Sequence, residues 1–290
     1  MPTSLQPTIF VVVLNYNGKE TLSSCLSSVY QSDYSLFEVV VVDNASNDGS
    51  FELAKNQFSR AHFIKNPVNV GFSKGNNIGI RFALEKFADY VLVLNNDACL
   101  KKNTLSKLVG VAQEKTVGSI LNPLIFNKDG RSIWFAGGQI LWSQMKNIHL
   151  TKISAKNLYS TEYCTGCAMF IGKEVFKKIG LFDERYFLYY EDADFSVRAK
   201  KAGFELLICP TAKVIHQEQS TIKNDLKIYW LVLSGLLFFS CHSDFSQKIW
   251  LFFYLQLRKL KNFHASVFKP SPQVSQVNKA YKDFKKLKLQ

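Results

Sequence analysis

Polar residues follow three apolar runs in the first hundred residues, and their types suit the binding of a ligand. These segments are Asn15-Tyr16-Asn17, Asp43-Asn44-Ala45-Ser46 and Asn95-Asn96-Asp97. Asn and Asp also favour turns, so any one segment alone is as readily explained as a turn. Three of them at the carboxyl ends of parallel strands predict a shared pocket, because ligands of open α/β sheets bind there.

A second acidic group, Glu191, Asp192 and Asp194, follows the aromatic run at residues 186–190. Carboxylates at a helix start can simply compensate the helix dipole, and Asp194 could pair with Arg198 four residues later. The aromatic run would also exclude water from Glu191 and Asp192. A carboxylate in such a place is a candidate general base for an alcohol.

A phosphate-bearing ligand would need a cation in this pocket, because the usual glycine-rich phosphate loops are absent from the sequence. Asp97 is a suitable hard-oxygen ligand for Mg²⁺ or Mn²⁺, which keep water and substrate phosphates as further ligands. His216, at the end of a later apolar strand, is a candidate second ligand. A histidine in that place is also common as a structural group.

Apolar periodicity predicts the elements that position these residues. Continuous apolar runs at 9–14, 37–42, 62–64 and 90–94 are typical of buried strands. Helices are predicted over 19–30, through Leu53 and Phe58, and through Ile80 and Leu84. Strand and helix therefore alternate, which indicates an α/β domain with a mainly parallel central sheet.

Further along the chain the pattern is less regular. Residues 119–170 predict a mixed region with some antiparallel strands. Helices are expected over Lys173–Ile179 and from Tyr190 to Gly203, and strands over Glu205–Cys209 and Lys213–Ile215.

Charge is distributed unevenly along the chain. The 290 residues carry a formal net charge of +13, of which residues 223–290 contribute +9 from 12 Lys or Arg and 3 Asp or Glu. A nucleic-acid binder would explain this excess, but no recognisable binding module is present, so nucleic acid is not an expected partner. We therefore divide the chain into a domain at 1–222 and a basic, aromatic-rich helical segment at 223–290.

The C-terminal segment contains two apolar stretches, 228–241 and 249–257, each too short to span a bilayer easily. Aromatic helices with basic flanks can lie in the interface of an anionic membrane. The alternatives are that they pack on the domain or form a homodimer contact, with Lys279 to Lys288 as a solvated tail. The N-terminus lacks the features of a signal peptide. We expect a cytoplasmic protein, peripheral on the inner face of the cell membrane.

The motifs taken together resemble the inverting family 2 glycosyltransferases, in the rhamnosyltransferase-like branch that builds bacterial surface glycans. They are VVVLNYNG (11–18), VVVVDNASNDGS (39–50), NVGFSKGNNIGIR (69–81), LVLNND (92–97), TGCAMFI (165–171), GLFDERYFLYYEDADFSVR (180–198) and VIH (214–216). The resemblance implies a GT-A (Rossmann-like) nucleotide-sugar-binding domain and a nucleotide-diphosphate sugar donor. It covers about residues 9–216, so the amphipathic helices expected in the C-terminal segment rest on composition alone.

The resemblance also assigns roles by position. It implies a donor site formed by Asn15, Tyr16, Asn17, Asp43, Asn44, Ser46, Gly71, Phe72, Lys74, Asn76, Asn95 and Asn96. Asp192 matches the catalytic base and Glu191 its partner, while Asp97 and His216 match the site of Mg²⁺ or Mn²⁺. The segment Asn95-Asn96-Asp97 has one carboxylate where many relatives have two. The acceptor is expected at Trp134, Gly166 and Cys167.

The expected activity is transfer of rhamnose or another hexose to a hydroxyl of a glycan or lipid-linked acceptor. The alternative is a non-catalytic carbohydrate-binding or scaffold protein with a transferase-like fold. A non-catalytic protein of this kind would be expected to lack Asp97 or Asp192, and both residues are present.

Overall fold

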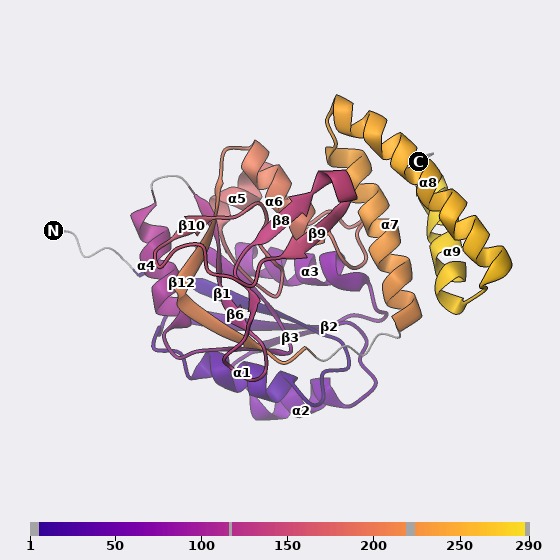
Figure 1. Ribbon diagram of the computed structural model, residues 1–290. Coiled ribbons are helices and arrows are strands. Elements are labelled where there is room, and N and C mark those ends of the chain that lie inside the picture. Colours follow the sequence, from indigo (N-terminus) through magenta and orange to yellow (C-terminus); the bar gives the residue numbers. More distant parts are fainter. Residues whose placement is uncertain (1–5, 116–117, 219–223, 288–290) are drawn as a thin grey trace.

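The computed structural model describes residues 6–115, 118–218 and 224–287 (Figure 1). The strands are β1 (Ile9–Asn15), β2 (Phe37–Asp43), β3 (His62–Lys65), β4 (Tyr90–Asn95), β5 (Ala98–Leu100), β6 (Ser119–Phe126), β7 (Ile133–Phe135), β8 (Gly138–Leu141), β9 (Lys146–His149), β10 (Tyr159–Ser160), β11 (Ala168–Gly172) and β12 (Glu205–His216). The helices are α1 (Leu22–Tyr30), α2 (Ser50–Gln57), α3 (Gly71–Glu85), α4 (Thr104–Glu114), the 3₁₀ turn η1 (Trp142–Gln144), α5 (Lys173–Ile179), α6 (Glu191–Lys201), α7 (Asn224–His242), α8 (Phe245–Phe268) and α9 (Pro272–Leu287).

A central sheet organises the N-terminal domain, with its main strands in the order β10-β12-β6-β11-β4-β1-β2-β3. Strands β3, β2, β1 and β4 are parallel, whereas β11 runs antiparallel to both β4 and β6. The predicted α/β class with a mainly parallel sheet is confirmed. So are antiparallel strands in the middle region, where β8 and β9 also form a separate hairpin.

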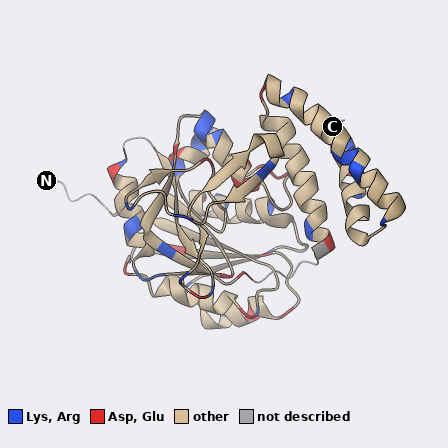
Figure 2. Ribbon diagram, in the orientation of Figure 1, with Lys and Arg blue, Asp and Glu red and all other residues tan. Residues whose placement is uncertain are grey.

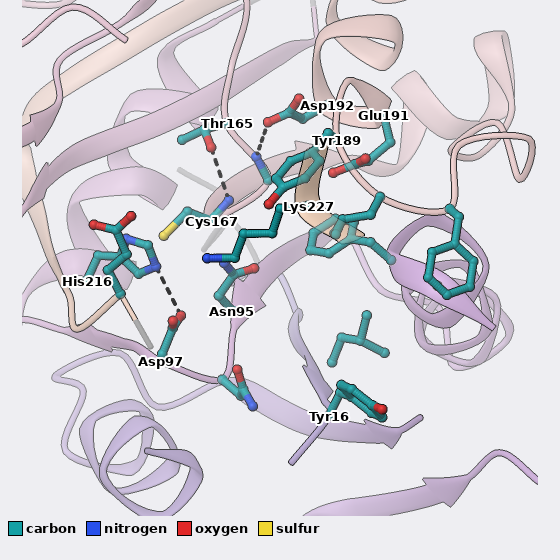
Figure 3. A pocket seen from close by; sticks show the side chains of 18 of the residues that line it. Tyr16, Asn95, Asp97, Thr165, Cys167, Tyr189, Glu191, Asp192, His216 and Lys227 are labelled. Atoms are coloured by element: carbon teal, nitrogen blue, oxygen red, sulfur yellow. Dashed lines mark hydrogen bonds and ion pairs between the residues drawn. The ribbon is translucent and has the colours of Figure 1, made fainter. Parts of the chain in front are cut away.

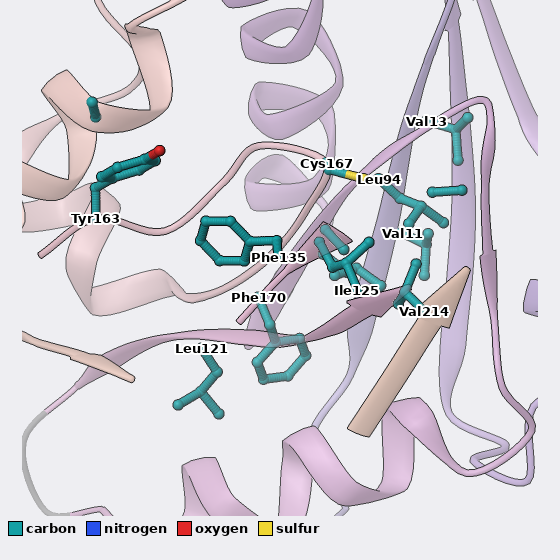
Figure 4. Close-up of a cluster of buried hydrophobic side chains, with 14 of the residues drawn as sticks. Val11, Val13, Leu94, Leu121, Ile125, Phe135, Tyr163, Cys167, Phe170 and Val214 are labelled. Atoms are coloured by element: carbon teal, nitrogen blue, oxygen red, sulfur yellow. The ribbon is translucent and has the colours of Figure 1, made fainter. Parts of the chain in front are cut away.

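Both faces of the sheet are buried, as the continuous apolar strands predict. Along β1, Val11 and Val13 belong to one hydrophobic cluster, whereas Phe10 and Val12 belong to the other. Figure 4 shows Val11 and Val13 in the first cluster, with residues of β4, β11 and β12 around them. Because a strand's side chains alternate between faces, helices on each side are needed to cover them. Helices α1 and α4 contribute to the first cluster, and α3, α5 and α6 to the second.

The end of β12 is the part of the sheet that matters most for the site. The sequence predicts two separate strands over 205–209 and 213–215, and this prediction is wrong. The structure has one strand, β12, whose register against β6 shifts between Cys209 and Lys213. Pro210 lies within this shift and lacks the N–H of a regular ladder, which explains the irregularity. Beyond it, β12 pairs antiparallel with the short strand β5, with His216 opposite Ala98.

The C-terminal helices differ sharply in burial. Helix α7 contributes Leu233, Phe238 and Phe239 to the same hydrophobic cluster as the sheet, so the alternative that these helices pack on the domain holds for α7. Helix α9 packs beside α7, where the hydroxyl of Tyr229 donates to Asp283 at 3.0 Å. Helix α8 instead exposes most of its large apolar side chains. Within the described ranges, the helices all fall short of the length and apolarity needed to cross a membrane.

Three parts of the sequence-based description fall wholly or partly outside the described residues. They are the proposed boundary at 222/223, the first five residues of the N-terminus and Lys288 in the Lys-rich end. Up to Leu287 that end belongs to helix α9, so the solvated-tail alternative is wrong for the described part. Since α7 shares the core of the sheet, the change in composition near residue 222 does not separate two hydrophobic cores.

The contrast between α7 and α8 gives a stability prediction. Phe238 is fully buried, whereas Phe253 is 57% exposed. We expect Phe238→Ala to lower the free energy of unfolding by about 3–5 kcal/mol, because it leaves a cavity. Phe253→Ala should change it by less than about 0.5 kcal/mol. Urea unfolding of both full-length variants without lipid tests this, and equal losses would contradict the described packing.

Candidate active site

A cavity of about 370 Å³ opens where the carboxyl ends of β1, β2 and β4 meet the start of α6 (Figure 3). One or more residues from each of the three polar strand ends contribute to its wall, as do β12 and the first turn of α7. The predicted site residues in the wall are Tyr16, Asn44, Gly71, Phe72, Asn95, Asn96, Asp97, Trp134, Gly166, Cys167, Glu191, Asp192 and His216.

Beneath the cavity, a buried hydrogen-bond network ties the strand ends together. The side-chain amide of Asn15 donates to Asp43 at 2.8 Å and to Ser46 at 3.1 Å. The amide of Asn96 donates in turn to the side-chain oxygen of Asn15 at 2.9 Å. Asp43 is fully buried and also accepts the backbone N–H of Ser46. The network fixes the relative positions of the three loops, because these buried polar groups would be costly to leave unpaired.

Some predicted donor residues therefore lie outside the cavity wall in this structure. They are Asn15, Asn17, Asp43, Ser46, Lys74 and Asn76. Asn17 accepts the backbone N–H of Asn47 and so helps to order the loop after β2. Lys74 is exposed on α3, and the amide of Asn76 donates to the carbonyl of Phe72 within the helix. In this structure Asn17 and Asn76 support the wall rather than form it.

The start of α3 borders the cavity and requires a glycine. Gly71 has a φ of +85°, and a Cβ added there would lie 2.5 Å from the carbonyl oxygen of Phe187. The carbonyl of Gly71 accepts the side-chain amide of Asn44 at 2.9 Å, and the N–H of Phe72 donates to Phe187. Only glycine combines this backbone conformation with so close an approach. The glycine-rich segment thus joins the loop after β2 to the loop that precedes α6.

Asp97 and His216 come together through the pairing of β5 with β12. The carboxylate Oδ1 of Asp97 lies 3.1 Å from Nε2 of His216, and both side chains are buried. A carboxylate oxygen is the kind of ligand that Mg²⁺ and Mn²⁺ prefer, and the imidazole nitrogen beside it could serve as a second ligand. The pair therefore fits Mg²⁺ or Mn²⁺. Within the described ranges, clusters of three or more His, Cys, Asp or Glu suited to a metal are absent.

Glu191 and Asp192 lie on the other side of the cavity, at the start of α6 (Figure 3). The carboxylate of Asp192 accepts the N–H of Gly166 at 3.1 Å and that of Ala193 at 2.7 Å. Burial raises the pKa of Asp192, although these hydrogen bonds oppose the increase. Burial, and then the charge of Asp192, raise the pKa of Glu191 well above the usual range. Because Glu191 is buried and Asp192 is half-buried beside it, the two carboxyl groups resist ionising together.

The turn that presents these carboxylates is strained. Tyr189 and Tyr190 both have positive φ, 69° and 66°, a conformation that costs about 1–3 kcal/mol each for residues with a Cβ. Helix α7 supports the turn. The hydroxyl of Ser234 donates to the carbonyl of Leu188 at 2.7 Å, and Tyr190 packs against Phe238 with ring centroids 5.3 Å apart. The C-terminal segment therefore helps to position the candidate base.

Sequence reasoning missed several residues of the wall, chiefly His149, Tyr189 and Lys227. His149 comes from β9, and burial together with nearby His216 lowers its pKa to about 4. Trp134 lies against both imidazoles, with ring centroids 4.4 and 4.5 Å away. Lys227 extends into the cavity from α7 (Figure 3). It precedes the uncharged run at 228–241, but that spacing alone does not reveal which side of the helix meets the cavity.

Comparison with known proteins identifies relatives that act on sugars. The chain is 28% identical over 225 residues to the low-salt glycan biosynthesis hexosyltransferase Agl10 of Haloferax volcanii, covering 76% of this chain and 71% of that protein. It is 26% identical over 216 residues to the dTDP-rhamnosyl transferase RfbF of Shigella flexneri, covering 73% and 70%. An N-acetylglucosaminyl-diphospho-decaprenol L-rhamnosyltransferase of Mycobacterium tuberculosis is 25% identical over 239 residues, with coverage of 74% and 78%. The expected similarity to rhamnosyltransferases is confirmed.

Solved structures share the fold at lower identity. GalNAc-T7, solved with UDP, GalNAc and Mn²⁺, matches with a TM-score of 0.60 and 20% identity, over 80% of this chain and 48% of that one. S. aureus TarS 1–349 in complex with UDP-GlcNAc matches with a TM-score of 0.59 and 18% identity, over 96% and 80%. These matches confirm the GT-A fold. The family model for glycosyl transferase family 2 matches residues 10–180, more than half of the chain, and the chain therefore belongs to this family of glycosyltransferases.

Proposed function

We propose that the enzyme transfers a sugar, with inversion at the anomeric carbon, from a nucleotide-diphosphate sugar to a hydroxyl group of a glycan or a lipid-linked acceptor. The arrangement of the cavity carries this proposal. A candidate base, Asp192, lies on one side, and the candidate diphosphate ligands Asp97 and His216 lie on the other (Figure 3). An acceptor can thus approach the anomeric carbon from one side while the leaving group departs on the opposite side.

Asp192 acts on the acceptor in this mechanism. Its carboxylate takes the proton of the acceptor hydroxyl while the hydroxyl oxygen forms a bond to the anomeric carbon. The bond from that carbon to the phosphate oxygen breaks, and the nucleoside diphosphate leaves with the electron pair. The hydrogen bonds from Gly166 and Ala193 orient the carboxylate. Its raised pKa makes it a stronger base than an exposed carboxylate, provided that it is ionised at the working pH.

Charge on the leaving diphosphate needs compensation, because the ionised carboxylate of Asp192 adds negative charge to the same cavity. A bound Mg²⁺ or Mn²⁺ at Asp97 and His216 would supply Lewis-acid neutralisation of the diphosphate. Lys227 provides a second positive charge. Among the wall residues of the described chain, it is the one Lys or Arg. We therefore assign Lys227 to the diphosphate as well.

The relatives support a choice of donor and acceptor. RfbF is named as a dTDP-rhamnosyl transferase, and the mycobacterial relative acts on a diphospho-decaprenol-linked sugar. We propose dTDP-rhamnose or another nucleotide-activated hexose as donor. The net charge of +9 on residues 223–290 supports the inner face of an anionic membrane as the place where a lipid-linked acceptor is met. A non-catalytic sugar binder would not need the buried acidic pair, which costs stability.

Replacement of the proposed base tests the mechanism. Asp192→Asn should lower kcat about 10²–10⁴-fold, because the amide cannot accept the proton of the acceptor. Donor binding should be unchanged, since Asp192 lies away from Asp97 and His216. Asp129→Asn, on an exposed turn, is the matched control and should retain full activity. Steady-state kinetics and calorimetric donor titration measure both effects, and full transfer activity in Asp192→Asn would exclude this base.

Titration with a nucleoside diphosphate separates the two proposed sources of positive charge. With dTDP and UDP as probes, Mn²⁺ should tighten binding to the wild type, and Asp97→Ala should abolish that gain. Lys227→Gln should weaken binding with and without Mn²⁺ by roughly tenfold, as expected for the loss of a charged hydrogen bond. Lys86→Gln, on an exposed residue after α3, is the control. If Mn²⁺ still tightens binding to Asp97→Ala, the metal site lies elsewhere.

The raised pKa of Glu191 predicts a pH-dependent stability. A carboxyl group whose folded-state pKa is raised contributes stability that is present below its unfolded-state pKa and lost as pH rises through the folded-state pKa. Its Oε2 is buried without a partner in the described residues. Glu191→Gln should therefore raise the free energy of unfolding at about pH 8 by roughly 1–3 kcal/mol. The difference should shrink toward acidic pH.

Urea unfolding at both pH values measures this difference. Glu52→Gln, on an exposed carboxylate of α2, is the matched control and should show little change. A Glu191→Gln variant that is less stable than the wild type at about pH 8 would show that the folded state favours the ionised form.

A further inference from the structure

Helix α8 presents an apolar stripe to solvent along its whole length. The residues of this stripe are Phe245, Ile249, Phe252, Phe253, Leu257, Leu260, Phe263, Val267 and Phe268, and all are exposed. Their spacings of three and four residues place most of them on one face of the helix. At 1.5 Å per residue, the 24 residues of α8 extend this stripe over about 36 Å.

The rest of α8 is held on the protein by both apolar and polar contacts, since Leu251 is buried in the same hydrophobic cluster as the sheet. Trp250 Nε1 donates to the carbonyl of Ser143 at 2.9 Å, and Tyr254 Oη donates to that of Gln144 at 3.1 Å. Asn262 donates to Asn278 of α9 at 2.6 Å. Asp244 and Gln247 form a capping box that fixes the start of the helix. The outward stripe is therefore not a consequence of a loosely placed helix.

The charges beside the stripe indicate what covers it. Helix α8 contains Lys248, Arg258, Lys259 and Lys261 but neither Asp nor Glu, and further lysines follow on α9 (Figure 2). A second copy of the chain, packed stripe against stripe, would bring these positive charges together. An anionic lipid surface instead complements them and accepts the aromatic side chains. The arrangement thus favours a lipid surface over self-association.

We propose that the outward stripe of α8 is the surface that enters the interface of an anionic membrane, with the helix lying in the membrane plane. The proposal rests on the membrane contact that is part of the proposed function. It places that contact on α8 alone rather than on both apolar stretches of the C-terminal segment. The first of these stretches lies in α7 and packs largely in the protein core. Since α7 also carries Lys227 into the cavity, docking through α8 would bring the active site near lipid-linked acceptors.

Vesicle flotation of the full chain tests the proposal without donor or acceptor, so its failure would leave the transferase assignment untouched. We expect wild type to bind phosphatidylcholine vesicles that contain phosphatidylglycerol, and to bind pure phosphatidylcholine more weakly. Leu257→Glu/Leu260→Glu should lower the partition coefficient at least about tenfold, because two apolar contacts become charged. Transfer to a water-soluble acceptor should be unchanged in this variant.

The matched control places the same charges on other exposed apolar residues. Leu36→Glu/Phe87→Glu changes two exposed residues of the catalytic domain and should leave vesicle binding at the wild-type level. A wild type that does not float with anionic vesicles would overturn the proposal, as would equal losses in both double variants. A lipid-free dimer that Leu257→Glu/Leu260→Glu dissociates, together with absent vesicle binding, would assign the stripe to a second copy instead.

Discussion

Burial of Glu191 beside the half-buried carboxyl group of Asp192 is the constraint on which the site depends. Water would stabilise both as anions, whereas the cavity disfavours their joint ionisation and raises the pKa of each. The surrounding structure offsets this cost with hydrogen bonds to Asp192 and with the packing of α7 against the strained turn before α6. In the proposed mechanism, a carboxylate that is easily charged in solution thereby becomes a base whose proton affinity suits transfer from an alcohol.

The opposite side of the cavity depends on topology. Asp97 and His216 are distant in sequence and meet because β5 folds back on the end of β12, where Ala98 lies opposite His216. The carbonyl of Asp97 also accepts the N–H of Gln217 at 2.8 Å, which extends this contact beyond the strand. One short antiparallel ladder thus holds both candidate metal ligands. The proposed catalytic side and the proposed diphosphate side are supported by different elements, so each can be perturbed separately.

Much of this arrangement could be predicted from the sequence, for physical reasons that differ between residues. The parallel strands were recognisable because both of their faces are buried, as Phe10 and Val11 illustrate. The polar ends of those strands pointed to one cavity, and the family motifs pointed to Asp97, Asp192 and His216. Lys227 and His149 escaped because their positions depend on how α7 and β9 pack, which no local spacing encodes. The opposite exposure of α7 and α8 was likewise hidden, since both are rich in apolar residues.

The proposed mechanism is a direct displacement, in which the acceptor enters beside Asp192 and the diphosphate leaves beside Asp97. The stereochemistry of the product tests this central claim most directly. Proton NMR of the transferred sugar, compared with the donor from which it came, gives the anomeric configuration on each side of the reaction. We predict the opposite configuration in the product. A product that retains the configuration of the donor would contradict a single displacement assisted by Asp192.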